Sequence, residues 1–185
     1  MRSFKQPSQT FNPYDAGAPR VQPDTSTPAL ATAVRIEDGI RRDALETGVF
    51  IGLDGAVLLR RQGLLSTIDY GSDELKGLRN TTFTHNHPGG ATFSVADVAL
   101  ASEFSFFELR VVTGQFRHRA VNLPNQTFDR WQKAYDSEQA WVVKALGEKV
   151  RTGQLHHRDF GFEVQHFIWH QLAKRFSFFY GRERS

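Results

Sequence analysis

Residues 84–97 read THNHPGGATFSVAD and join the end of a strand, a tight reversal and the start of a helix. The strand is predicted over residues 81–87, which are rich in threonine and alternate in the β manner. Side chains two apart on a strand project from one face, with their Cα atoms about 6.5–7 Å apart. The imidazoles of His85 and His87 can therefore converge on a single ion.

The reversal supplies a third ligand for such an ion. Zinc takes nitrogen and oxygen ligands at about 2.0–2.2 Å, and a catalytic site keeps three protein ligands and one open position for water. A Gly-Gly loop folds back tightly, so that Asp97, in the first turn of a helix predicted over residues 95–104, faces the strand end. Each part also has a simpler explanation, because His-x-His pairs are common without a metal and Ser94-x-x-Asp97 matches a capping box. Their combination predicts a His/His/Asp metal site.

Composition limits the chemistry available to this site. The sequence has no cysteine, so disulfides, thiol catalysis and Cys-ligated metals are excluded, and any metal is held by His, Asp or Glu. The net charge of +3 comes without a long run of Lys or Arg, so a nucleic-acid partner is not indicated. No apolar run reaches the ~18 residues of a membrane span, and the N-terminus lacks the apolar region of a signal peptide. We expect a cytoplasmic protein with no membrane partner.

The rest of the chain predicts an α+β fold. Strands and helices follow one another in no regular βαβ order, which favours a mixed, mainly antiparallel sheet flanked by helices over a doubly wound nucleotide-binding fold. The turn dipeptide Asp54-Gly55 marks one hairpin and Gly114 marks another, and the chain ends in two amphipathic helices. The expected elements are helices over residues 34–45, 72–78, 95–104, 127–150 and 159–179 and strands over residues 47–53, 56–61, 81–87, 106–113 and 116–123.

The length of 185 residues fits one domain with an appendage. Five of the seven prolines fall at or before Pro28, in a polar stretch with few aliphatic side chains. Such a stretch buries too little apolar surface to offset the entropy lost on ordering. We expect a disordered, Pro-rich leader over residues 1–30, a metallo-domain over residues 31–125, and a C-terminal helical extension over residues 126–185 that packs on it.

Over residues 46–113 the sequence resembles the JAB/JAMM (MPN+) zinc metalloproteases. Their signature is an upstream Glu, then His-x-His-Pro, a short loop and Ser-x-x-Asp, and the chain matches it at Glu46, residues 85–88, Ser94 and Asp97. The form His-Asn-His-Pro is similar to the RadC-like bacterial branch and to JAB domains of bacterial and phage toxin-type proteins. The loop between the Pro and the Ser encloses five residues, one fewer than is usual in the family. The resemblance implies a JAB/MPN fold, which is similar to that of the cytidine deaminases.

The same resemblance implies a role for each matching residue. The residues that would bind zinc are His85, His87 and Asp97. Glu46 would act as the general base on the zinc-bound water, and Ser94 would donate a hydrogen bond to the oxyanion. Glu37 is the alternative base, and capping of the helix at residues 95–104 is the alternative role of Ser94.

Two functions of different classes follow. The first is that of a zinc-dependent metallopeptidase or isopeptidase, which hydrolyses an amide or isopeptide bond in a protein substrate such as a ubiquitin-like conjugate. The second is that of a RadC-like, phage-associated or toxin-associated module that uses the fold in DNA-related or assembly processes without proteolysis; a toxin-like member would be exported without a signal peptide. The contiguous string His85-Asn86-His87 does not fit an HNH nuclease, whose three residues are spread along a ββα unit. Cytidine deaminase chemistry needs a Cys-x-x-Cys pair that the chain lacks.

The remaining signals predict packing and partner surfaces. His166-x-x-x-His170 has the spacing of one helix face but lacks the Glu of a His-Glu-x-x-His metal motif, which favours a packed or interfacial pair. His118 is expected on an exposed strand and His156-His157 in a loop. The aromatic run over residues 160–180 predicts core packing, with part of it exposed as a surface for a protein partner. Substrate specificity is expected in the loop over residues 63–70 and in the C-terminal helices.

Overall fold

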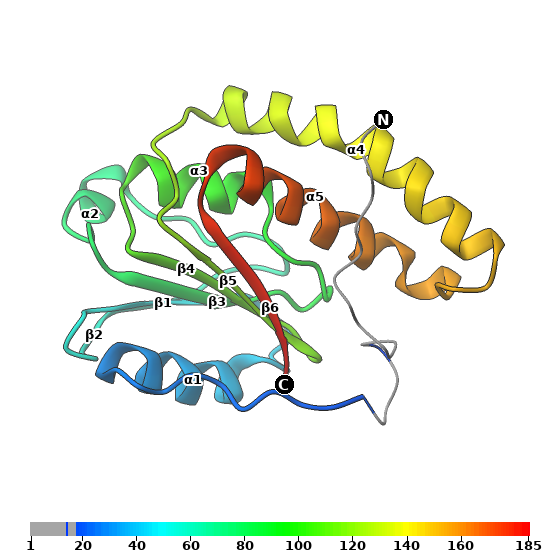
Figure 1. Ribbon diagram of the computed structural model, residues 1–185. Helices are drawn as coiled ribbons and strands as arrows, with labels where there is room; N and C mark the ends of the chain where they lie inside the picture. Colours follow the sequence, from blue (N-terminus) through cyan, green and yellow to red (C-terminus); the bar gives the residue numbers. More distant parts are fainter. Residues whose placement is uncertain (1–13, 15–17) are drawn as a thin grey trace.

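The computed structural model describes Tyr14 and residues 18–185 of the chain. These residues form an α+β fold with one six-stranded sheet in the order β2-β1-β3-β4-β5-β6 (Figure 1). The α+β class and the mixed sheet expected from the sequence are confirmed. The elements are α1 (Pro28–Ile40), β1 (Thr47–Ile51), β2 (Val57–Gln62), α2 (Ser72–Lys76), β3 (Thr82–Asn86), α3 (Val95–Glu103), β4 (Glu108–Val112), β5 (Phe116–Val121), α4 (Phe128–Arg151), a 3-10 turn (His157–Asp159), α5 (Phe160–Phe176) and β6 (Phe179–Arg184).

β3 is a central strand of the sheet, with β1 on one side and β4 on the other. β3 runs parallel to β4 and antiparallel to β1, and the pairs β1–β2, β4–β5 and β5–β6 are antiparallel. A parallel pair needs a crossover, and α3 supplies it between β3 and β4. The chain therefore leaves the end of β3, turns back and enters α3 directly beside the sheet.

Helices cover both faces of the sheet (Figure 1). Helix α1 lies on one face, and α3 and α5 lie on the other, with α4 outside them. Alternation along β1 divides the core accordingly, because Val49 and Ile51 pack with Ala29 and Ala33 of α1, while Phe50 joins the larger cluster on the opposite face.

A buried ion network attaches α1 to the sheet. The carboxylate of Glu37, with no exposed surface, accepts hydrogen bonds from Arg110 Nη2 at 3.1 Å, from Arg117 Nε at 2.8 Å and from Thr84 Oγ1 at 3.0 Å. Thr84 and His85 are neighbours in β3, so their side chains point to opposite faces of the sheet. The interpretation of Glu37 as an alternative base is therefore wrong, because the sheet separates it from the histidines.

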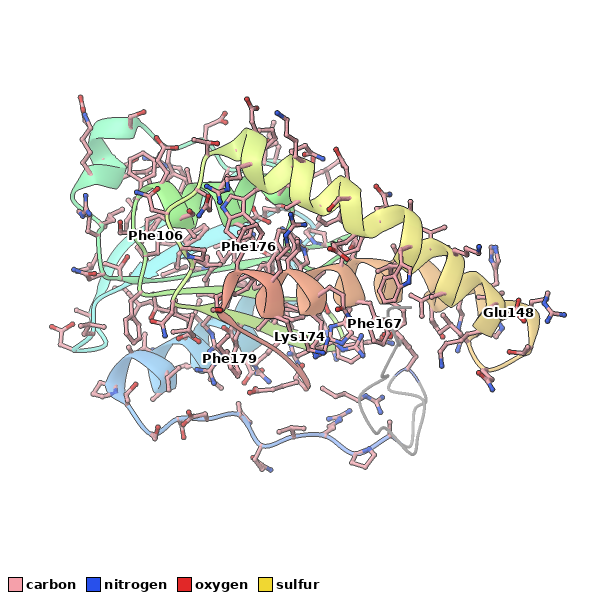
Figure 2. The ribbon with its side chains drawn as sticks, turned by 45° about the horizontal axis from the view of Figure 1, so that its top comes forward. Phe106, Glu148, Phe167, Lys174, Phe176 and Phe179 are labelled. Carbon is pink, nitrogen blue, oxygen red and sulfur yellow. The ribbon has the colours of Figure 1, made fainter. Side chains whose placement is uncertain are left out.

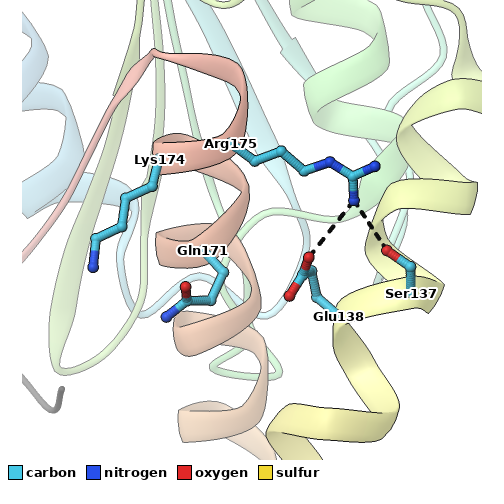
Figure 3. A pocket seen from close by; sticks show the side chains of 5 residues that line it. All are labelled: Ser137, Glu138, Gln171, Lys174 and Arg175. Atoms are coloured by element: carbon cyan, nitrogen blue, oxygen red, sulfur yellow. Dashed lines mark hydrogen bonds and ion pairs between the residues drawn. The ribbon is translucent and has the colours of Figure 1, made fainter. Parts of the chain in front are cut away.

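The two long C-terminal helices are present and pack together. Trp131 of α4 meets the ring of Phe176 at a centroid distance of 4.9 Å, and Figure 2 shows Phe176 and Phe167 on α5. At the surface, Arg175 of α5 donates to Ser137 Oγ at 3.1 Å and lies 3.6 Å from a carboxylate oxygen of Glu138 on α4 (Figure 3). These contacts hold α4 against the outer side of α5.

Both ends of the described chain differ from the sequence-based expectation. The first helix starts at Pro28 and not at residue 34, because the Thr27 side chain accepts a hydrogen bond from Leu30 N and caps it. The last helix ends at Phe176, where Ser177 adopts φ 57°, and the chain continues as the unexpected strand β6. An aromatic run carries no period that separates helix from strand, so this change could not be predicted from the residue pattern.

The expected leader lies partly outside the described residues. Of its described part, Tyr14 is buried and donates a hydrogen bond to Glu163 Oε1 at 2.9 Å. Val21 N donates to the carbonyl of Arg184 in β6 at 2.9 Å, and Arg184 Nη1 donates to Ala18 O at 2.6 Å, so this part of the segment lies against the end of β6. Among all the residues that the structure describes, no helix is long and apolar enough to cross a membrane.

Candidate metal centre

The two histidines of the motif lie at the end of β3, on the face covered by α3. Phe83, two residues earlier on the same face, stacks on the ring of His85 at 4.9 Å and an angle of 15°. Gly48 of β1 lies opposite His85 in the sheet. His87 follows the strand, and its Nε2 atom is 3.0 Å from Nε2 of His85. The sequence-based expectation that both imidazoles converge is met.

Asp97 reaches the same point from the first turn of α3. The Ser94 side chain accepts a hydrogen bond from Asp97 N at 3.0 Å, and Asp97 Oδ2 accepts one from Ser94 N at 2.7 Å, which is a complete capping box. This arrangement fixes the carboxylate, whose oxygens lie 3.5 Å from His85 Nε2 and 3.5 Å from His87 Nε2. The capping box is therefore present, and it leaves the Asp97 carboxylate close enough to both histidines to share an ion with them.

The spacing of these atoms fits a single metal ion. Within the described residues, His85, His87 and Asp97 form the one group of three whose ligand atoms all lie within 4.8 Å of one another. Tetrahedral zinc with ligands at about 2.0–2.1 Å separates its ligand atoms by roughly 3.3–3.4 Å. The observed separations of 3.0 Å and 3.5 Å bracket that value. The group could hold a metal ion without a change of backbone.

Hydrogen bonds set the protonation that a ligand needs. His87 Nδ1 lies 3.2 Å from the carbonyl oxygen of Ala91 and 3.0 Å from that of Thr92. Carbonyl oxygens only accept, so Nδ1 carries the proton and Nε2 presents its lone pair to the site. Burial and the neighbouring His85 lower the pKa of His87 to about 4, which keeps the imidazole neutral at pH 7.

Asp97 is ionised in the same site. Burial by itself would raise the pKa of its carboxyl group, but the two imidazoles and the Ser94 N–H outweigh burial and hold the pKa below the usual range. Two imidazoles and one carboxylate are a donor set that suits zinc and other divalent transition metals.

Glu46 lies beside this group, immediately before β1. Its Oε1 atom is 3.7 Å from His87 Nε2. Its backbone is held from both sides, because Glu46 N donates to Leu64 O at 2.8 Å and Gly63 N donates to Glu46 O at 2.8 Å. Burial raises the pKa of Glu46 to about 7, against an opposing effect of His85. The carboxyl group can thus take up and release a proton near neutral pH.

Asn86 positions Glu46, a role that the sequence-based reasoning missed. It lies between the two histidines and points to the other side of β3, with no exposed surface. Its Oδ1 accepts from Thr47 N at 2.7 Å, and its Nδ2 donates to the carbonyls of Asp43 and Leu45 at 3.2 Å and 3.1 Å. The amide therefore ties both sides of Glu46 to β3. The only sign in the sequence was the choice of Asn at a buried strand position.

A cavity of about 470 Å³ opens over the centre. Glu46, His85, His87, Ser94 and Asp97 lie in its wall. Much of the remaining wall is apolar and comes from Leu65, Ile68, Tyr70, Phe83 and Leu100. The loop expected to carry specificity thus lines the cavity, whereas the lining residues all fall between Glu46 and Leu100 and include none from the C-terminal helices.

The other histidines are placed elsewhere. His118 was expected to be exposed, but it is 4% exposed, because its ring packs against Phe93 and Tyr180, and its Nδ1 lies 3.2 Å from Tyr180 Oη. His166 is buried and shares the same hydroxyl at 3.0 Å, and its ring lies 6.4 Å from that of His170. The expectation of a packed pair on α5 agrees with these contacts. His156 precedes the 3-10 turn and caps it through Arg158 N.

Comparison with known proteins adds no relative. No family model, curated protein or solved structure matches the chain significantly. The description of the site as one that could hold a metal ion therefore rests on the three ligand residues and their geometry. The resemblance to the JAB/JAMM family rests on its motif residues alone.

Proposed function

We propose that the protein is a zinc-dependent metallopeptidase or isopeptidase of the JAB/JAMM type. The observation that carries the proposal is the His85/His87/Asp97 donor group with the Glu46 carboxylate 3.7 Å from His87 Nε2, all in the wall of one open cavity. A structural metal site is closed by four protein ligands, whereas three ligands beside a free carboxylate match the arrangement of a hydrolytic centre.

The chain's own residues then divide the work of hydrolysis. When bound, zinc supplies a water of lowered pKa and polarises the scissile carbonyl. Glu46 accepts the proton of the attacking water and returns it to the leaving amine. Partial burial raises the pKa of Glu46 to about 7. A carboxyl group with that pKa can both accept a proton and return it near neutral pH.

Ser94 is the donor to the oxyanion. Its Oγ accepts one hydrogen bond, from Asp97 N at 3.0 Å, and this leaves the hydroxyl proton free for a second partner. The residue also lies in the cavity wall, beside the metal ligands. Capping and oxyanion stabilisation therefore use different parts of the same hydroxyl group.

The cavity suits an extended polypeptide substrate with an apolar side chain near the scissile bond. The apolar wall formed by Leu65, Ile68 and Leu100 can cover such a side chain, and the polar end of the cavity holds the reacting groups. Both linear peptides and isopeptide-linked conjugates, such as those of ubiquitin-like proteins, meet this description.

Replacement of Glu46 tests the proposal. Glu46→Gln keeps the size of the side chain but removes the base, so it should retain zinc and fold while turnover falls by ~10²–10⁴. Glu103→Gln, at the exposed end of α3, is the matched control and should retain full turnover. The assay uses zinc-loaded protein and a panel of linear and isopeptide-linked peptides, with zinc measured by elemental analysis.

Two outcomes would contradict the proposal. One is wild-type protein that binds no zinc at the site. The other is fully loaded wild-type protein that cleaves no substrate on a broad panel, with a cellular effect that Glu46→Gln preserves. The second outcome would support a RadC-like or toxin-associated module without proteolysis.

A further inference from the structure

The loop between the ligands is held by the C-terminal part of the chain. Residues 88–93 connect His87 to the start of α3, and their backbone carbonyls at Ala91 and Thr92 receive the His87 Nδ1–H. A ligand's second-shell acceptor orients its ring only if the acceptor itself is fixed. What fixes this loop therefore decides how well His87 is placed.

Tyr180 of β6 makes one of the contacts that hold this loop. Its Oη lies 3.3 Å from Thr92 Oγ1, 3.2 Å from His118 Nδ1 and 3.0 Å from His166 Nδ1. A phenol has one proton to donate and two acceptor sites, so the Tyr180 hydroxyl can satisfy all three partners at once. Burial lowers the pKa of both histidines well below the usual range, so each is neutral and each offers one N–H and one lone pair.

Helix α5 makes two more contacts with the same loop. Trp169 Nε1, on a side chain with no exposed surface, donates to Phe93 O at 2.8 Å. Gly90 adopts φ +82°, and a Cβ at that position would lie 3.2 Å from the ring of Phe162. Side chains that come 72 or more residues later in the chain therefore meet the loop at Gly90, Thr92 and Phe93.

We propose that the Tyr180 hydroxyl and the Trp169 indole are positioning groups of the metal centre, which hold loop 88–93 so that its carbonyls orient His87. The inference rests on the proposed metal site and adds to it the C-terminal segment as a structural part of that site. The link is short, because Tyr180 binds the side chain of Thr92 and His87 binds the carbonyl of the same residue.

Shape alone does not require the hydroxyl. The ring of Tyr180 already packs against Phe93 at 5.9 Å and His118 at 6.4 Å, and Phe would keep those contacts. The hydroxyl adds only the polar link between β6, α5 and the loop. Removing it therefore separates the packing of Tyr180 from its effect on metal binding.

The test is the zinc affinity of Tyr180→Phe, measured at 25 °C by competition with a chromophoric chelator. We expect the Kd for zinc to rise about tenfold, the lower end of the 10–100-fold effect of second-shell changes. Trp169→Phe should give a similar rise. Tyr135→Phe is the matched control: its ring contacts Trp169 at 5.5 Å, it loses the same hydroxyl group, and it should bind zinc as wild type does.

A second pair of variants covers the case in which Tyr180→Phe does not fold. Thr92→Val removes the hydroxyl that Tyr180 binds and should weaken zinc binding, whereas Thr92→Ser keeps the hydroxyl and should restore most of the affinity. A merely structural role would lower the melting temperature of the metal-free and zinc-bound forms equally and leave the Kd unchanged in all variants. That result would overturn the inference while wild-type zinc binding stands. Wild-type protein that binds no zinc would overturn the proposed function itself.

Discussion

Two regions of the chain build the candidate metal centre in different ways. Residues 46–97 contain the three ligands, the carboxylate beside them and the capping serine. Among the described residues, the segment from α4 to β6 adds no side chain to the cavity wall, but it binds the loop between the ligands through Trp169 and Tyr180. The candidate ligands thus come from one short stretch of the sequence, whereas the loop between them is contacted by residues far along the chain.

The difference explains which parts of the site sequence reasoning could find. His85 and His87 converge because of the two-residue period of a strand, and Asp97 is placed by a three-residue capping pattern. Both rules are local. The contacts of Tyr180 and Trp169 with the loop span 88 and 76 positions, and no local period encodes such contacts.

The largest expected effect lies in the first region. His87→Ala should remove most of the zinc, because it leaves two ligands and an open side of the site, and the double variant His85→Ala/His87→Ala should bind none at the centre. Elemental analysis of purified protein should give close to one zinc per wild-type chain. His156→Ala, outside the cavity wall, is the control and should keep its zinc. Stoichiometric zinc in the double variant would show that the metal is bound elsewhere.

The fold shows the same division between local and distant information. The hairpin at Asp54-Gly55 and the helix after Ser94 are marked by residues within a few positions, and both are present. The start of α1 at Pro28 also has a local signal that the prediction overlooked, since Thr27-Pro28 is an N-cap followed by proline at N1. Strand β6 was not marked, because its pairing with β5 is decided by chain reversal at Ser177 and not by its own pattern.

A second prediction concerns Glu37, which lies on the opposite face of the sheet from the candidate ligands. Glu37→Gln should lower the free energy of unfolding by about 3–5 kcal/mol, because it removes the buried negative charge that Arg110 and Arg117 share. Within the described part of the chain, Arg110 would then keep only Glu108 as a charge partner, and Arg117 only Asp38. Zinc affinity should not change, since the sheet lies between Glu37 and the ligands. Denaturant unfolding of zinc-free protein measures the loss. Asp38→Asn removes a carboxylate that is 56% exposed and pairs with Arg117 and, at 3.9 Å, with Arg41, so it should cost about 0–1 kcal/mol. A loss below 1 kcal/mol for Glu37→Gln would mean that Glu108 and Asp38 are sufficient partners for the two arginines.

Ser94 tests whether capping and catalysis are separable. Ser94→Ala should lower turnover by ~10²–10³ and stability by about 0.5–2 kcal/mol, because it loses both the oxyanion donor and the helix cap. Thr127→Ala is the control from the C-terminal region, where the Thr127 side chain caps α4 by accepting from Arg130 N at 3.4 Å. It should lose stability without loss of turnover. Equal turnover in Ser94→Ala and Thr127→Ala would leave Ser94 with the capping role alone.

The smallest expected effect concerns the N-terminal segment. As for the C-terminal segment, the question is whether contacts between residues far apart in the sequence stabilise the domain. A Pro-rich leader without contacts would contribute nothing to stability, but Tyr14 is buried, donates to Glu163 on α5 at 2.9 Å and meets the ring of Phe116 at 5.3 Å. Tyr14→Phe keeps the ring contact and removes the hydrogen bond to a carboxylate, which should cost about 1.5 kcal/mol. For a chain of this size that loss corresponds to ~3–6 °C in the melting temperature. Tyr135→Phe is again the matched control and should melt within ~1 °C of wild type, because the hydroxyl that it loses is not bound to a buried carboxylate. If Tyr14→Phe melts with wild type as well, the segment is not docked in solution, and long-range contacts matter to this domain only at its C-terminal end.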